Sequence, residues 1–240
     1  MIGTATPFTL VVLFFHTNHC CPPAVLLAGC SSSTSIIPNV YLMHMGYNDG
    51  TVYQVSGSTV VNSDISVTLG TIVGDSSLEI RIGYFALCIN QDVGSWLCSQ
   101  NASSLAASLD TTQDPLNLLH VADAFKEKIV FPYLLIVAAA LAFITFILIM
   151  PSPPILQFVS TFISFIAGIL VLVSVLWQHT ASVAGASIAT NLGNGTVFAG
   201  VGVTAMILGW FTFGILAVII IGLYIYAMGN RAMNKAEGLE

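Results

Sequence analysis

Residues 202–228 read GVTAMILGWFTFGILAVIIIGLYIYAM and carry no charged side chain. The hydrocarbon core of a bilayer is about 30 Å thick, so a helix that crosses it needs roughly 20 apolar residues. Three other uncharged stretches meet this requirement, at residues 8–29, 130–150 and 155–177. Because lipid offers no hydrogen-bond partners, each stretch must satisfy its own backbone as a helix. The sequence therefore predicts a membrane protein with four transmembrane helices.

The distribution of charge agrees with this prediction. Only 7% of the 240 residues are charged, against roughly a quarter in soluble domains. Five Lys and Arg oppose eleven Asp and Glu, too few cations to neutralise a run of nucleic-acid phosphates. This composition excludes an ordinary cytosolic enzyme, a disordered chain and a nucleic-acid-binding protein. Residues 30–129 carry the whole net charge of −6. Their acidic residues are Asp49, Asp64, Asp75, Glu79, Asp92, Asp110, Asp114, Asp123 and Glu127, and their basic residues are Arg81, Lys126 and Lys128.

The first predicted span, 8–29, is interrupted by polar residues and two prolines. We expect a helix with a kink near Pro22, because proline breaks the helical hydrogen-bond ladder. A cleaved signal peptide is the alternative, although the positive charge that opens such peptides is missing. Four side chains of metal-ligand type lie close together in this span: His16, His19, Cys20 and Cys21. At helical spacing three of them share a face, where they either bind a metal ion or pack against neighbouring helices.

Four spans place both termini on the same side of the membrane. Two N-glycosylation sequons, which begin at Asn101 and Asn194, fall in segments that this topology puts on one face. We therefore expect those segments outside and both termini in the cytosol. The cytosolic segments are then 1–7, 151–154 and 229–240, and the outer segments are 30–129 and 178–201.

The first outer segment has the pattern of a small folded domain. Polar and apolar residues alternate at 64–69 and 78–82, and β-branched and aromatic residues are frequent at 40–47 and 51–55. Turn sequences rich in Gly, Asn, Asp and Ser separate these runs, as is typical of short strands. We expect an antiparallel sheet of four or five strands, followed after Pro115 by a short helix that leads into the second span.

The five cysteines divide by location. Cys88 and Cys98 lie in the outer segment, where an oxidising compartment favours a disulfide. We expect this bond to be a structural staple worth about 2–3 kcal/mol in the chain-entropy account. Cys20, Cys21 and Cys30 belong to the first span or its end, and we expect them to remain thiols.

Catalytic signatures are missing from the sequence. It contains no nucleotide-binding loop, zinc-protease motif or serine-hydrolase motif, so we expect neither an enzyme nor a cofactor. The spans contain no Asp, Glu, Lys or Arg, which argues against a proton-coupled transporter. The acidic outer segment could concentrate Ca²⁺, but it has no EF-hand spacing, and we assign no metal ligands. Small residues four apart, such as Ser160, Ser164 and Gly168, predict close helix packing.

One motif is more specific than the rest. Gly83-Tyr84-Phe85-Ala86-Leu87-Cys88 is followed by Ser95-Trp96-Leu97-Cys98. A glycine and an aromatic pair before the first of two cysteines, in the first outer segment of a four-span protein, resembles the claudin superfamily. Within that superfamily the chain is similar to the fungal calcium-regulator and membrane-fusion family, which is induced during mating. The likeness includes 26–31 at the end of the first span and the Ile-Pro-Asn-Val-Tyr sequence at 37–41.

The resemblance implies a claudin-like four-helix transmembrane bundle with a small extracellular antiparallel β-sheet. It implies a plasma-membrane protein that supports calcium influx and cell fusion between mating partners, at cell-contact or fusion sites. The motif residues Gly83, Phe85, Cys88, Trp96 and Cys98 would hold the outer domain together. Phe85 stands where claudins have tryptophan, which argues against a paracellular pore.

The expected partners are the lipid membrane and either a calcium-channel subunit or a second copy of the chain, with neither nucleic acid nor a small-molecule substrate. Two alternatives remain open at this point. One is a tetraspan cell-adhesion or membrane-organising scaffold without ion transport. The other is an oligomeric calcium channel.

Overall fold

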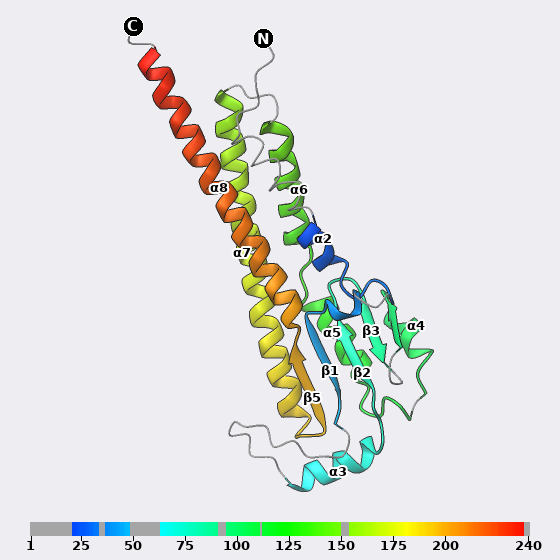
Figure 1. Ribbon diagram of the computed structural model, residues 1–240. Coiled ribbons are helices and arrows are strands. Elements are labelled where there is room, and N and C mark those ends of the chain that lie inside the picture. Colours follow the sequence, from blue (N-terminus) through cyan, green and yellow to red (C-terminus); the bar gives the residue numbers. More distant parts are fainter. Residues whose placement is uncertain are drawn as a thin grey trace. The chain divides into compact units, whose positions relative to one another are not determined.

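The computed structural model describes residues 21–33, 37–48, 63–90, 95–110, 112–149 and 154–237. These residues are mostly helical and include one five-stranded antiparallel sheet (Figure 1). The chain divides into two compact units. The sheet unit consists of residues 25–131 and 177–207, and the helical unit includes residues 132–176 and 208–237.

The sheet has the strand order β4-β3-β2-β1-β5, with every neighbouring pair antiparallel. Its strands are β1 (Met43–Tyr47), β2 (Glu79–Ile82), β3 (Leu87–Asn90), β4 (Trp96–Ser99) and β5 (Val197–Val201). The strands predicted at 40–47 and 78–82 are confirmed as β1 and β2. The strand predicted at 51–55 lies outside the described residues.

The origin of the fifth strand differs from the prediction. We expected all strands in the first outer segment, yet β5 comes from the second, between the last two long helices. It pairs with β1 from Met43↔Val201 to Tyr47↔Val197.

Helix α7 (Pro154–Leu192) also continues beyond the predicted span end at 177. Extending an existing helix avoids the cost of nucleation, and residues 181–189 are rich in alanine, the strongest helix former.

The alternating run at 64–69 is not a strand, and that prediction is wrong. Residues Ser63–Val73 form α3. Alternation over six residues is also compatible with a helix, and strand preference depends strongly on which neighbours a segment meets. The short helix expected after Pro115 is confirmed as α5 (Leu118–Lys128). The remaining short elements are α2 (Cys21–Leu27), the 3₁₀ helix η1 (Ile37–Asn39) and α4 (Ala102–Ala106).

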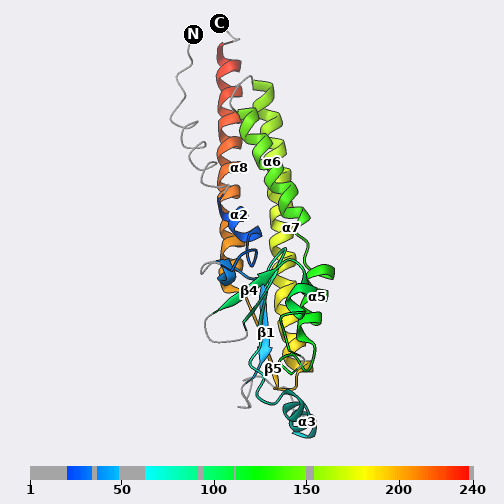
Figure 2. The same cartoon turned by 90° about the vertical axis from the view of Figure 1, so that its right-hand side faces the viewer.

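The apolar core of the sheet unit lies on one face of the sheet. Six side chains of β1, β2 and β3 on this face are at most 1% exposed: Met43, Met45, Ile80, Ile82, Leu87 and Ile89. Helix α5 packs against β1 and β2 (Figure 2). Gly185 of α7 leaves room beside Phe125 and Met43, because a Cβ there would lie 2.6 Å from the Phe125 ring. The second outer segment therefore contributes to this core.

The helical unit contains the apolar helices predicted as spans. Among the described residues, two helical stretches are long and apolar enough to cross a membrane: Phe158–Leu192 in α7 and Val203–Tyr226 in α8 (Val203–Glu237). Helix α6 (Tyr133–Ile149) counts as a third candidate when it is taken together with α5 as one span. Most of the predicted first span and the turn at 151–154 lie outside the described residues.

Small residues pack the helices of this unit, as their spacing predicted. Ser160 is fully buried and donates a hydrogen bond to the Thr145 carbonyl of α6 at 3.4 Å. A Cβ on Gly168 would lie 2.7 Å from Ile220 of α8. Small residues let helix backbones approach closely in a membrane, where no hydrophobic effect drives them together.

We expect Gly202→Ala to destabilise the sheet unit by about 1–3 kcal/mol. Gly202 donates from its amide to Leu42 O at 2.9 Å, and a Cβ there would overlap the Tyr41 carbonyl. The change should lower the thermal unfolding temperature of the purified protein. Gly70→Ala is the matched control, since Gly70 lies in α3 with no atom near its Cβ position, and alanine favours helices. Equal melting of the two variants would contradict this account of the β1–β5 junction.

Candidate functional site

The second face of the sheet carries both cysteines and the tryptophan of the motif and most of the sheet's polar groups. Directly paired residues point to the same side of a sheet. The register therefore places two rows of side chains on this face. We call it the disulfide face and define it by Gly200, His44, Arg81, Cys88 and Cys98 in one row and Phe198, Gly46, Glu79, Asn90 and Trp96 in the next.

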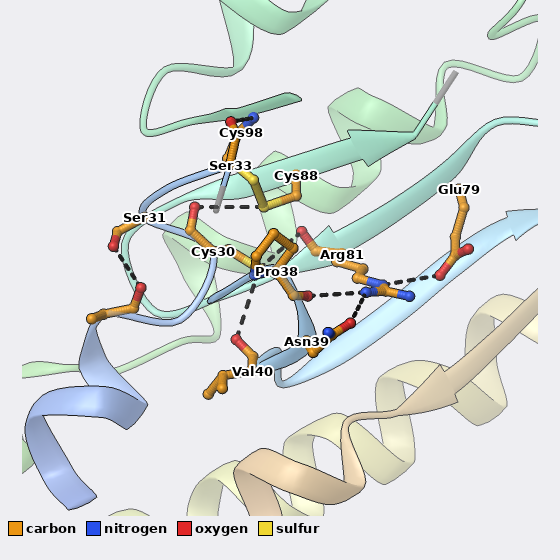
Figure 3. Close-up of a disulfide and its surroundings, with 11 residues drawn as sticks. Cys30, Ser31, Ser33, Pro38, Asn39, Val40, Glu79, Arg81, Cys88 and Cys98 are labelled. Carbon is orange, nitrogen blue, oxygen red and sulfur yellow. Dashed lines mark hydrogen bonds and ion pairs between the residues drawn. A yellow bond between two sulfur atoms is a disulfide. The ribbon is translucent and has the colours of Figure 1, made fainter. Parts of the chain in front are cut away.

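Arg81 is the centre of the disulfide face (Figure 3). Its Nη1 donates to Asn39 Oδ1 at 2.8 Å and to the Pro38 carbonyl at 3.2 Å. Its Nε donates to Glu79 Oε1 at 3.1 Å, and its side chain is only 16% exposed. The guanidinium therefore fastens the 3₁₀ helix η1 to strand β2.

Two aromatic rings complete the surroundings of this cation. The Arg81 Cζ atom lies 3.8 Å from the centroid of the Trp96 ring and 4.8 Å from that of Tyr41. A planar guanidinium stacks well on such rings, and the attraction grows when water is excluded. Arg81 thus joins β4, through Trp96, to the loop before β1, through Tyr41.

The disulfide lies next to this cluster. Cys88 and Cys98 are directly opposite each other on β3 and β4, and the structure contains the bond between them. Cys30, Ala86 and Cys88 are fully buried together, and the Cys30 carbonyl lies 3.6 Å from the Cys88 Sγ. Burial raises the pKa of the Cys30 thiol to about 12, so this cysteine packs as an unreactive hydrophobic group.

The other motif residues have separate roles. Gly83 is buried where a Cβ would overlap the Gly29 carbonyl and touch the Cys30 Cβ, so glycine lets β2 approach the end of the first span segment. Trp96 covers Arg81 and packs on the Cys30 cluster. Phe85 is exposed and lies outside this cluster. The disulfide face therefore carries three of the five motif residues, Cys88, Trp96 and Cys98, and Gly83 contacts Cys30 beside them.

His44 is the one titratable imidazole on this face. Its ring lies 5.3 Å from the Tyr41 ring and 5.8 Å from the Phe198 ring. Within the described part of the chain its Nδ1 is buried without a hydrogen-bond partner. Burial lowers the pKa of His44 below its usual 6.5; Glu79 partly opposes this effect and Arg81 adds to it. The site therefore favours the neutral imidazole.

The acidic surface considered for Ca²⁺ forms a pocket of about 600 Å³ between α4 and α5, lined partly by Asp110, Asp114 and Asp123. Asp114 already accepts bonds from the Tyr47 hydroxyl and from the amides of Leu118 and Leu119. Asp123 pairs with Lys126 at 2.8 Å.

In the described residues no three His, Cys, Asp or Glu side chains converge as metal ligands. Tight Ca²⁺ binding needs six to eight oxygens, which this pocket does not assemble.

The two sequons occupy different local structures. Asn101 is exposed and caps α4, where its Oδ1 accepts from the Ser103 amide at 3.0 Å. Asn194 lies in the turn between α7 and β5 with a φ of 46°, and the Thr196 hydroxyl is buried against the Gly193 carbonyl. Glycosylation at Asn101 and Asn194 remains a prediction.

The arrangement of the disulfide face is structural rather than reactive. Its cation is paired, its cysteines are bonded or buried, and its histidine contacts aromatic rings. Sequence reasoning missed Arg81 and His44 as members of this face, and Tyr41 as a ring that contacts Arg81. Strand alternation offered a signal for Arg81, because Glu79 and Arg81 share the polar side of β2 and its apolar side consists of Ile80 and Ile82.

The possible metal-binding cluster of His16, His19, Cys20 and Cys21 lies outside the residues whose side chains are described.

These features define a mostly helical membrane protein with a disulfide-bonded antiparallel sheet. The family described as Ca2+ regulator and membrane fusion protein Fig1 matches residues 66–229, which is more than half of the chain. The chain belongs to this family, as the Gly-aromatic-Cys motif indicated. A comparison with curated proteins finds no match.

We expect Cys88→Ser and Cys98→Ser each to cost about 2–3 kcal/mol of stability, because the reduced loop gains freedom in the unfolded chain. Both variants should reach the cell surface poorly, as measured by surface biotinylation. Cys30→Ala is the control, since it keeps the disulfide and removes one buried sulfur at a cost of roughly 1 kcal/mol. Normal delivery of both serine variants would rule out a staple.

We expect the sheet unit to lose stability as the pH falls below about 6.5, where the unfolded chain protonates His44 more readily than the folded chain does. Above that pH both states hold neutral imidazole, and the full stability is present. The purified protein should therefore melt at a lower temperature at about pH 5 than at about pH 7.5.

His44→Gln should reduce this pH dependence, because glutamine does not titrate in this range. His120→Gln changes an exposed histidine of α5 and is the matched control. If the glutamine variant at His44 shows the same pH dependence as the native chain, His44 is not its source.

Proposed function

We propose that this chain is a claudin-like plasma-membrane protein that regulates calcium influx and membrane fusion during fungal mating, at sites of cell contact. The family match carries this proposal, because residues 66–229 include most of the sheet unit and the apolar helices. Regulation through protein contacts fits an outer unit held rigid by a disulfide and a paired arginine. The calcium-channel subunit expected as a partner belongs to this proposal.

We also propose the four-span topology, with spans at 8–29, 130–150, 155–177 and 202–228. Both termini would then be cytosolic. Its support is the pairing of β5 with β1. Because paired strands must lie in the same compartment, the segments before the second span and after the third are on one side of the membrane. That is the arrangement that four spans require.

Calcium entry and fusion in mating cells test this function together. Cells that lack the chain should show a smaller rise in cytosolic calcium on contact, recorded with a calcium-sensitive protein, and fewer fused pairs. Raising external calcium should restore fusion if calcium entry is the limiting step. A fusion defect with normal calcium entry and no rescue would favour the scaffold instead.

Purified protein in liposomes separates a regulator from a channel. The regulator should give no calcium flux above that of empty liposomes, because the sequence of the proposed spans at 130–150, 155–177 and 202–228 contains no charged residue that could line a pore. Flux from the chain alone would contradict this proposal and support the oligomeric channel.

A further inference from the structure

Helix α3 exposes three of its apolar side chains, whereas α5 buries most of its own. The exposed fractions are 50% for Ile65, 71% for Val67 and 52% for Ile72. Both views show α3 projecting beyond the sheet, without covering either face (Figures 1 and 2). Exposed apolar side chains gathered on one element indicate a surface that is covered when the protein acts.

The polar side chains of α3 are turned back onto the helix itself. Thr68 Oγ1 donates to the Asp64 carbonyl at 2.8 Å, and Thr71 Oγ1 donates to the Val67 carbonyl at 2.8 Å. A hydroxyl paired in this way needs no water or protein partner, which is the condition that lipid imposes on polar groups. A surface built to bind protein would instead offer such hydroxyls to its partner.

The charge and spacing of α3 specify the kind of surface. Asp64, in the first turn, is the charged residue of α3, and the helix contains no Lys or Arg, so it has no cation that attracts an anionic headgroup. Ile65, Leu69 and Ile72 follow at i, i+4 and i+7 and form one apolar stripe, in which Leu69 is partly buried. Val67 lies on the opposite side of the helix and is not part of this stripe. A helix of 11 residues is too short to cross a bilayer, but it can lie in the plane of the interface.

We propose that α3 is a lipid-binding helix that inserts its Ile65–Leu69–Ile72 stripe into the interface of a neutral, zwitterionic membrane. This binding deepens the proposed role in membrane fusion and rests on that role for its biological setting. The binding itself is inferred from the exposure, the paired hydroxyls and the lack of Lys and Arg in α3, so it can be measured without mating cells.

The test uses the full chain in nanodiscs, floated on a density gradient with added phosphatidylcholine vesicles. Nanodiscs with the native chain should float with the vesicles, and empty nanodiscs should not. The double variant Ile65→Ser, Ile72→Ser should bind about tenfold more weakly, because it removes exposed apolar area. The double variant Thr68→Ser, Thr71→Ser keeps both hydroxyls and should bind within about twofold of the native chain.

Other occupants of α3 would give different results. Native nanodiscs that do not float, or serine variants at Ile65 and Ile72 that float equally well, would overturn the proposal. Isoleucine-dependent clustering of nanodiscs without vesicles would identify a second copy as the partner, which also overturns it. Loss of binding in about 1 M salt would indicate an electrostatic contact elsewhere, since uncharged contacts survive such screening.

Calcium entry in cells keeps this test separate from the proposed function. If flotation fails while calcium entry still requires the chain, only the α3 proposal is wrong. If flotation succeeds while calcium entry is unaffected by loss of the chain, the regulatory function is wrong and the lipid-binding helix stands.

Discussion

The pairing of β1 with both β2 and β5 is the interaction on which the sheet unit depends. Strand β5 lies between α7 and α8, far from β1 along the chain. Without β5, β1 would be an edge strand with unpaired amides and carbonyls. With it, residues 43–47 and 197–201 share one ladder, and the close approach of Gly202 to Tyr41 at its end admits no side chain. Closing so long a loop costs entropy, which the ladder and the apolar core together offset.

The two faces of this sheet solve different problems. The apolar face buries methionine, isoleucine and leucine against α5 and α7, which removes hydrophobic surface from water. The disulfide face holds one cation, and a partly buried charge is costly unless its hydrogen bonds are made. Arg81 meets that condition through Glu79, Asn39 and the Pro38 carbonyl. The same bonds attach η1 to the sheet, so one side chain positions several elements.

Membership of a calcium-regulator family does not require this chain to hold calcium in a preformed cage. Two of the three carboxylates at the acidic pocket already serve the fold, since Asp114 begins α5 and Asp123 pairs with Lys126. Helix α3 leaves Ile65, Val67 and Ile72 exposed beside the sheet. A rigid sheet that presents an apolar helix suits contact with membranes, which is consistent with a family named for membrane fusion.

The sequence by itself determined the apolar helices, the Cys88–Cys98 pair, strands β1 and β2, and the family, because each depends on local composition or on a short motif. Only the tertiary structure decided that 63–73 is a helix, that β5 completes the sheet, and that Arg81, Tyr41 and His44 surround the disulfide. These outcomes depend on which distant segments meet. A six-residue alternation suits either a strand or a short helix, and the pairing that chooses between them is absent from the local pattern.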